Sequence, residues 1–177
     1  LGNSPAIGGQ SKYAIKSGLG VGIFKGNPAS IQLAGDTGYI QDSAFSTTDD
    51  GNDGGIDFTT ANDALLVGVH NGVFYIDNTT SKPTFANSVA ASTTFGTNPN
   101  TNSTDGVAFV NDDPDQEYVV KADAAVGQAI FGLCGNINDF AAGDAKDGAS
   151  TATFDSGTQG ETKMFRIVRS AEDPDNE

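Results

Sequence analysis

The chain has 177 residues, of which 37% are hydrophobic, and its 9 Lys and Arg against 23 Asp and Glu give a formal net charge of −14. This length and apolar content suit the core of one β-sandwich or β-barrel and are small for two well-filled domains. The negative charge repels nucleic-acid phosphates and anionic membrane surfaces, so we expect neither as a partner.

Residues 1–10 are predicted to form an extended N-terminal arm, because they contain one Pro and three Gly and show little periodicity. Residues 11–177 are predicted to form a single β-domain. Short strands separated by frequent turn signals are typical of an antiparallel β-barrel or β-sandwich. The first such candidates are Lys12–Lys16, Ile23–Lys25, Pro28–Leu33 and Thr37–Gln41.

The strongest strand signal is the apolar run Leu65–Asp77, which is interrupted at Asn71-Gly72. Asn and Gly tolerate the positive φ that a type I′ turn requires at both central positions. We therefore predict a β-hairpin of Leu65–His70 and Val73–Asp77. Two strands alone are barely stable in water, so this hairpin must pack against other strands.

A second hairpin is predicted where two apolar runs, Gly106–Val110 and Tyr118–Ala122, flank a polar turn that contains Pro114. Gln128–Cys134 is predicted to be a strand or a short helix. The last predicted strands are Thr151–Phe154 and Lys163–Val168.

Long polar stretches rich in Gly, Asp, Asn, Ser and Thr are predicted to be loops, which are often binding surfaces. Exposed loops are expected above all at Ser46–Gly55 and Ser92–Asp105, and another polar loop at Asp139–Ser150. The run Asp113–Glu117 recurs almost intact as Asp173–Glu177. Similar turn chemistry explains this recurrence better than a duplicated half-domain, because the surrounding residues do not match.

Few residues could support catalysis. His70 is the only histidine, so a Ser/His/Asp or Cys/His site would have to use it. The sequence contains no G-x-S-x-G nucleophile motif. We therefore predict a structural or surface role for His70, no catalytic residues and no enzymatic activity. Cys134 is the only cysteine, which excludes an internal disulfide, and we predict that it is buried in the core.

The best candidate for a metal site is the Gly-rich acidic run Asp49–Gly55, whose oxygens could surround Ca²⁺. No Glu closes this loop at the twelfth position, as an EF-hand would require, and Asp144–Asp147 is a weaker candidate. A solvated acidic loop is the better interpretation of both runs. We predict no metal and no cofactor, and Ca²⁺ at the first run remains the open alternative.

Three groups of residues carry a family resemblance, and none of them contains a catalytic motif. The first group is Gly2-Asn3-Ser4-Pro5, Gly9-Gln10, Tyr13-Ala14-Ile15, Ile23–Gly26 and Gly35-Asp36; the second is Leu66-Val67-Gly68-Val69, Gly72 and Phe74-Tyr75; the third is Val110–Val120, Phe165–Val168 and Asp173–Glu177. On these residues the chain resembles a family of tailed-bacteriophage head proteins that decorate or cement the capsid exterior.

The resemblance implies a non-enzymatic β-protein on the outer surface of the virion capsid, where it bridges coat subunits and stabilises the head. The implied partner is the major capsid protein, and self-association as a trimer or dimer is compatible with it. Residues Leu1–Gly9, above all Ile7, are expected to contact a neighbour, either by adding a strand to a sheet edge or by lying across a seam. The alternative is a host- or carbohydrate-binding β-module of a head fibre or tail.

Overall fold

The computed structural model describes residues 9–31, 38–42, 65–138, 143–160 and 165–171, where the regular secondary structure is almost entirely β-strand. The predicted all-β, antiparallel fold class is therefore confirmed. Of the predicted arm, Gly9 is exposed and Gln10 already belongs to the first strand, while residues 1–8, including Ile7, lie outside the described ranges. The predicted loop at Ser46–Gly55 also lies outside them.

The described residues form eleven strands and one short 3₁₀ helix. In chain order they are β1 Gln10–Ile15, β2 Ile23–Phe24, β3 Pro28–Ile31, β4 Ile40–Asp42, β5 Leu65–Ile76, β6 Pro83–Ala86, β7 Ser88–Val89, β8 Gly106–Asn111, η1 Gln128–Ile130, β9 Cys134–Asn138, β10 Thr153–Gly160 and β11 Phe165–Arg166. No helix among them is long and apolar enough to cross a bilayer.

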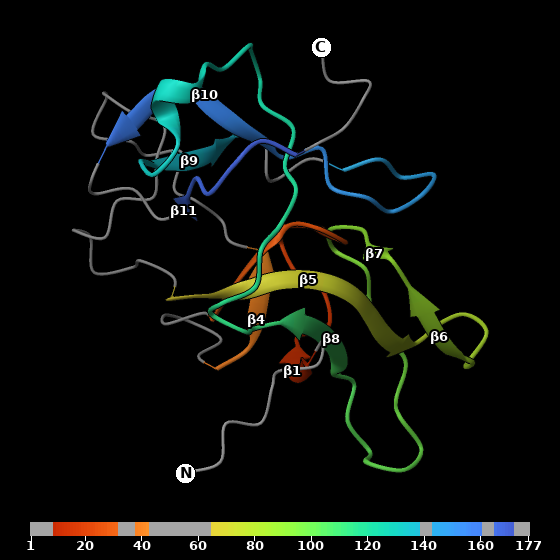
Figure 1. The fold of residues 1–177 in the computed structure, drawn as a ribbon. Helices are drawn as coiled ribbons and strands as arrows, with labels where there is room; N and C mark the ends of the chain where they lie inside the picture. The colour runs from red at the N-terminus through yellow and green to blue at the C-terminus, as the bar shows by residue number, and fades with distance from the viewer. Residues whose placement is uncertain (1–8, 32–37, 43–64, 139–142, 161–164, 172–177) are drawn as a thin grey trace, which may run out of the picture.

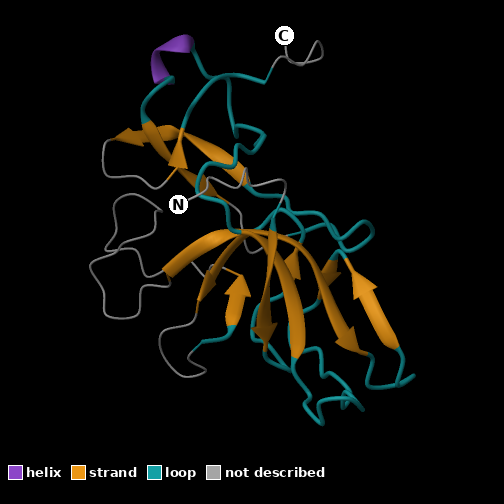
Figure 2. Cartoon of the chain, turned by 60° about the horizontal axis from the view of Figure 1, so that its bottom comes forward, coloured by secondary structure: helices purple, strands orange, loops and turns teal. Residues whose placement is uncertain are grey.

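The largest sheet is built around β5, which is 12 residues long. One edge of β5 pairs with β8, and the other edge pairs with β3 near its start and with β6 near its end. Outside this centre, β1 joins β8 and β4 joins β3, so the order is β1-β8-β5-β3-β4 with β6 attached to β5. The strands are antiparallel and curve together without a ladder between β1 and β4, so the described residues form no closed barrel (Figure 2).

The predicted hairpin centred on Asn71-Gly72 is wrong, because β5 runs straight through these residues (Figure 1). His70 pairs with Val110 and Gly72 pairs with Phe109, so Asn71 is an extra residue in a β-bulge. Gly72 has φ 142°, a conformation that residues with a side chain rarely adopt. The Asn-Gly pair therefore marks a bulge, since β6 and β8 supply partners to the second half of the strand.

The second predicted hairpin is also wrong. Its first strand forms as β8, but both edges of β8 are occupied by β1 and β5. The segment Tyr118–Ala122 lies outside the large sheet, and its last residue makes an isolated parallel bridge to Phe154 of β10. A hairpin partner has no free edge of β8 to pair with.

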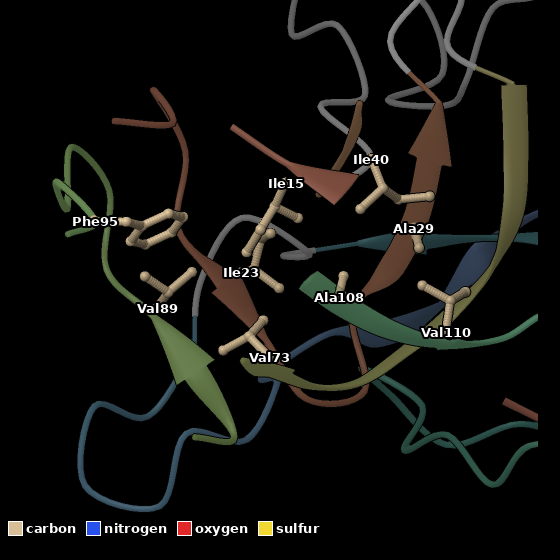
Figure 3. Packing of buried hydrophobic residues seen from close by; sticks show 9 residues of the cluster. All are labelled: Ile15, Ile23, Ala29, Ile40, Val73, Val89, Phe95, Ala108 and Val110. Atoms are coloured by element: carbon tan, nitrogen blue, oxygen red, sulfur yellow. The ribbon is translucent and has the colours of Figure 1, made fainter. Parts of the chain in front are cut away.

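One apolar core lies between the curved sheet and the two-stranded ribbon of β2 and β7, which gives the described part a sandwich-like arrangement (Figure 3). Burial alternates along β8, where Ala108 and Val110 are fully buried and the residues between face outward. Burying each large aliphatic side chain contributes about 1.5–3 kcal/mol. The cluster consists of Ile15, Ile23, Ala29, Ile40, Val73, Val89, Phe95, Ala108 and Val110.

The second sheet has the order β10-β9-β11 and lies at one end of the large sheet (Figure 1). The loop before β10 ties it to β2: the Lys25 amide donates to the Gly148 carbonyl at 2.9 Å, and the Ser150 amide donates to the Lys25 carbonyl at 2.8 Å. In this sheet Ile137 and Phe154 are buried. Cys134 is only partly buried, so its predicted place in the core is wrong, because it begins β9 directly after the exposed residues Gly132 and Leu133.

We expect Gly68→Ala to lower the free energy of unfolding by about 2 kcal/mol or more, as overpacking does. A Cβ at Gly68 would collide with the Asn111 carbonyl and lie 2.9 Å from the Asp112 Cα, and both belong to backbone that cannot retreat cheaply. Gly20→Ala is the matched control, since a Cβ there meets nothing within 4 Å. Urea unfolding monitored by circular dichroism measures both, and equal stabilities would contradict this packing.

Candidate binding surface

Three phenylalanines from different strands gather on the outer face of the large sheet, and we call them the aromatic row: Phe74 of β5, Phe85 of β6 and Phe109 of β8. Phe74 and Phe85 are direct cross-strand partners, with ring centroids 4.6 Å apart. Phe85 and Phe109 are stacked, with centroids 6.3 Å apart and an interplanar angle of 21°. These contacts stabilise the rings against one another on a hydrogen-bonded sheet.

The row is accessible to solvent. Phe85 is 73% exposed, and Phe74 and Phe109 are partly exposed. Single exposed apolar side chains are ordinary on protein surfaces, but adjoining large ones mark binding sites more often. The row is therefore a surface suited to contact another molecule.

A hollow of about 360 Å³ lies beside the row. The bulge in β5 shapes it, because Gly72 leaves one wall without a side chain. The side-chain amide of Asn87 is held in place because it donates a hydrogen bond to the Asp147 backbone carbonyl at 2.9 Å. The hollow therefore offers aromatic faces together with amide groups, and its lining is Asn71, Gly72, Val73, Phe85, Ala86, Asn87 and Phe109.

Sequence reasoning missed the aromatic row. The sequence assigns Phe85 to no strand and places Phe74 and Phe109 in separate hairpins. The available signal was the alternation in β8, where Phe109 falls between the small or branched residues Ala108 and Val110 that fill the core. The pairing of β5 with β6 and β8 decides which aromatic side chains become neighbours. No local sequence pattern predicts this pairing.

The expected exposed loop at Ser92–Asp105 is mostly exposed, as predicted. One side chain within it, Phe95, is buried and stacks on Tyr75 with ring centroids 4.8 Å apart. The Phe95 amide donates to the Ser17 hydroxyl at 2.8 Å. Phe95 therefore anchors the middle of the loop to the core and holds the neighbouring polar residues of the loop at the surface.

His70 lies within β5 and is only 1% exposed. Its Nε2 is 3.2 Å from the Gln41 carbonyl oxygen, which can only accept, so Nε2 carries the proton and donates. Burial lowers the pKa of His70 from 6.5 to about 4, although the bond to Gln41 acts in the opposite direction. The ring is buried and neutral at pH 7, which fits the structural role expected from the sequence.

Of the two acidic runs considered as metal sites, the structure describes Asp144–Asp147. Asp144 accepts from the Lys146 amide at 2.8 Å and Asp147 accepts from the Ala149 amide at 2.9 Å, so each carboxylate closes a local turn. Among the residues that the structure describes, no three His, Cys, Asp or Glu side chains are grouped to hold a metal ion. The other candidate, Asp49–Gly55, lies outside these residues.

In comparisons with known proteins, no family model matches the chain, and no match was found among curated proteins or solved structures. The aromatic row and the adjoining hollow are the described surface features that bear on function.

We expect acid to destabilise the fold through His70. Below pH 6.5 the unfolded chain binds a proton at this residue that the folded chain rejects until about pH 4. The contribution of His70 to the free energy of unfolding therefore falls as the pH drops through this window and levels off below it, and the loss is about 2–3 kcal/mol by pH 4.5.

The control for this prediction is His70→Gln, which does not titrate and whose amide can donate to the Gln41 carbonyl in place of Nε2. Urea unfolding of both proteins at pH 7 and pH 4.5 isolates the contribution of His70, because the carboxylates titrate in both. An equal loss in the two proteins would show that the buried imidazole is not the cause.

Proposed function

We propose that this chain is a capsid decoration or cement protein of a tailed bacteriophage, which binds the outer surface of the coat-protein shell and bridges its subunits. The observation that supports this proposal is the aromatic row. Aromatic side chains are enriched at the centres of protein interfaces, where they carry much of the binding energy. The major capsid protein is the partner that the sequence resemblance implies.

The rigidity of the aromatic row also supports protein binding. Its rings stand on strands of one hydrogen-bonded sheet and touch each other, so little conformational freedom is lost when a partner covers them. On a capsid, many copies bind symmetry-related sites, and contacts that are weak singly can together hold neighbouring subunits. A net charge of −14 keeps particles that display many copies from adhering to one another.

The N-terminal arm is the second part of the proposed interface. It leads directly into β1, which ends the strand order of the large sheet and pairs only with β8 among the described strands. An arm leaving from the edge of a sheet can extend to a neighbouring subunit and add a strand to it. We propose that Leu1–Gly9, with Ile7 as its apolar anchor, makes this contact.

The second candidate is a host- or carbohydrate-binding module of a head fibre or tail. The hollow beside the aromatic row favours it, since the faces of Phe85 and Phe109 and the amides of Asn71 and Asn87 combine apolar and hydrogen-bonding surface. Particle mapping separates the two candidates. Many copies distributed over the shell support decoration, whereas a few copies at vertices or on the tail support the adhesive module.

Replacing Phe85 by Ser should weaken binding to heads assembled without this protein by about tenfold or more, as expected for an interface anchor. The ring is 73% exposed, so the substitution should leave the fold intact. Val168→Ser is the matched control, because Val168 is 56% exposed and lies outside the row. Co-sedimentation with purified heads measures both variants, and equal binding would refute a role for the row in capsid attachment.

Deleting residues 1–9 should also weaken attachment to the same heads while leaving the circular-dichroism spectrum and melting temperature almost unchanged. The deletion stops before Gln10, where β1 begins, so the large sheet retains all its described strands. Unchanged attachment after the deletion would show that the arm makes no contribution to the interface.

A further inference from the structure

The connector between β8 and η1 exposes apolar side chains in an extended stretch. It passes from the large sheet to the small one (Figure 1). Tyr118, Val119 and Val120 are 39%, 85% and 43% exposed, and residues 117–121 contain neither a turn nor a bend. We call residues 117–121, with the sequence Glu-Tyr-Val-Val-Lys, the exposed segment. Its exposed β-branched and aromatic residues are types that favour strands.

The exposed segment has one unused edge. At its end the Phe154 amide donates to the Lys121 carbonyl at 2.8 Å, and the Asp123 amide donates to the Phe154 carbonyl at 3.0 Å. Backbone groups alternate sides along an extended chain, so those of Tyr118 and Val120 face away from β10. Within the described ranges neither residue makes a backbone hydrogen bond. An unpaired apolar edge of this kind is a template for another strand.

The segment is also held in place before any partner arrives. Just upstream, the Tyr13 hydroxyl donates to the Asp112 carboxylate at 2.8 Å, and the Tyr118 hydroxyl donates to the Asn111 carbonyl at 3.0 Å. Downstream, the bonds to Phe154 fix the other end. A strand anchored at both ends loses less conformational entropy when it pairs than a free one does.

We propose that the exposed segment pairs antiparallel with the same segment of a second copy, with Val119 on the two-fold axis. In this register Glu117 of each copy lies opposite Lys121 of the other, and Tyr118 lies opposite Val120. Opposite charges and aromatic–aliphatic pairs across strands both stabilise an antiparallel ladder. Because the axis repeats every contact, the dimer contains two such ion pairs and two such apolar pairs.

The charges of Glu117 and Lys121 favour a second copy as the partner strand and fix its register. A register centred on Val120 would place Lys121 opposite Val119, and one centred on Tyr118 would place Glu117 opposite Val119, so neither pairs Glu117 with Lys121. The charges of the segment are therefore complementary to those of its own copy in one alignment, and the Val119 pair is the one that leaves the free backbone groups of Tyr118 and Val120 facing each other. Arg169 lies 3.5 Å from Glu117 and adds a cation at each end of the seam in an otherwise acidic protein.

The proposed dimer uses residues outside the aromatic row and the N-terminal arm. A test of the dimer is therefore independent of a test of the proposed function. Sedimentation equilibrium of the full chain tests it with four proteins: the natural chain, E117K, K121E and the double variant E117K/K121E. Each single reversal creates two like-charge pairs and should weaken dimerisation by about tenfold or more. The double variant restores both pairs and should dimerise more tightly than either single variant, although the lysine at position 117 then lies beside Arg169.

Mixing the two single variants gives a second readout. E117K is basic at both positions and K121E is acidic at both, so the mixture should form a heterodimer although neither protein dimerises well alone. A natural chain that stays monomeric at about 1 mM would overturn the proposal. So would a dimer that the single reversals leave unchanged, or a double variant that remains monomeric.

The register is tested separately by cross-linking. V119C/C134S places one thiol on the proposed axis and removes the native one, and oxidation should convert it to a covalent dimer. A125C/C134S is the control, since Ala125 is also exposed but lies outside the exposed segment. Cross-linking at position 125 that equals or exceeds cross-linking at position 119 would overturn the register.

Discussion

The structure depends on the hydrogen bonding of β5 along both of its edges. An isolated strand in water gains little, and pairing with β8 on one side and with β3 and β6 on the other makes β5 the centre of the sheet. The core then forms on the face to which Val73, Ala108 and Val110 point. Gly68 shows how closely these strands meet, because the backbone at Asn111 occupies the space of its missing side chain.

The bulge at Asn71-Gly72 links this central strand to the proposed binding surface. One extra residue shifts the pairing with β8 between His70 and Gly72, and the strand after the bulge presents Val73 to the core and Phe74 to the outside. The same irregularity opens the hollow beside Phe85 and Phe109. A local departure from regular sheet geometry thus shapes the surface proposed to bind a partner.

The aromatic row and the exposed segment are proposed to bind in different ways because their backbones differ in hydrogen bonding. The aromatic row stands on strands whose ladders are already formed, so it can offer side-chain faces but few backbone bonds. Within the described ranges the backbone groups of Tyr118 and Val120 in the exposed segment make no backbone hydrogen bond, and its charge pattern is self-complementary, so we propose it as a strand edge. The net charge of −14 disfavours nonspecific contacts between copies.

The all-β class and several strands were predictable from sequence, because alternation and turn residues are local signals. Lys12–Lys16, Ile23–Lys25 and Pro28–Leu33 correspond closely to β1, β2 and β3. The pairing of strands was not predictable. Asn71-Gly72 carries a turn signal, yet its flanking residues form one strand because distant segments supply hydrogen-bond partners on both edges. For the same reason only the tertiary structure brought Phe74, Phe85 and Phe109 together: side-chain neighbours across a sheet are fixed by register, and register depends on contacts between residues far apart in the chain.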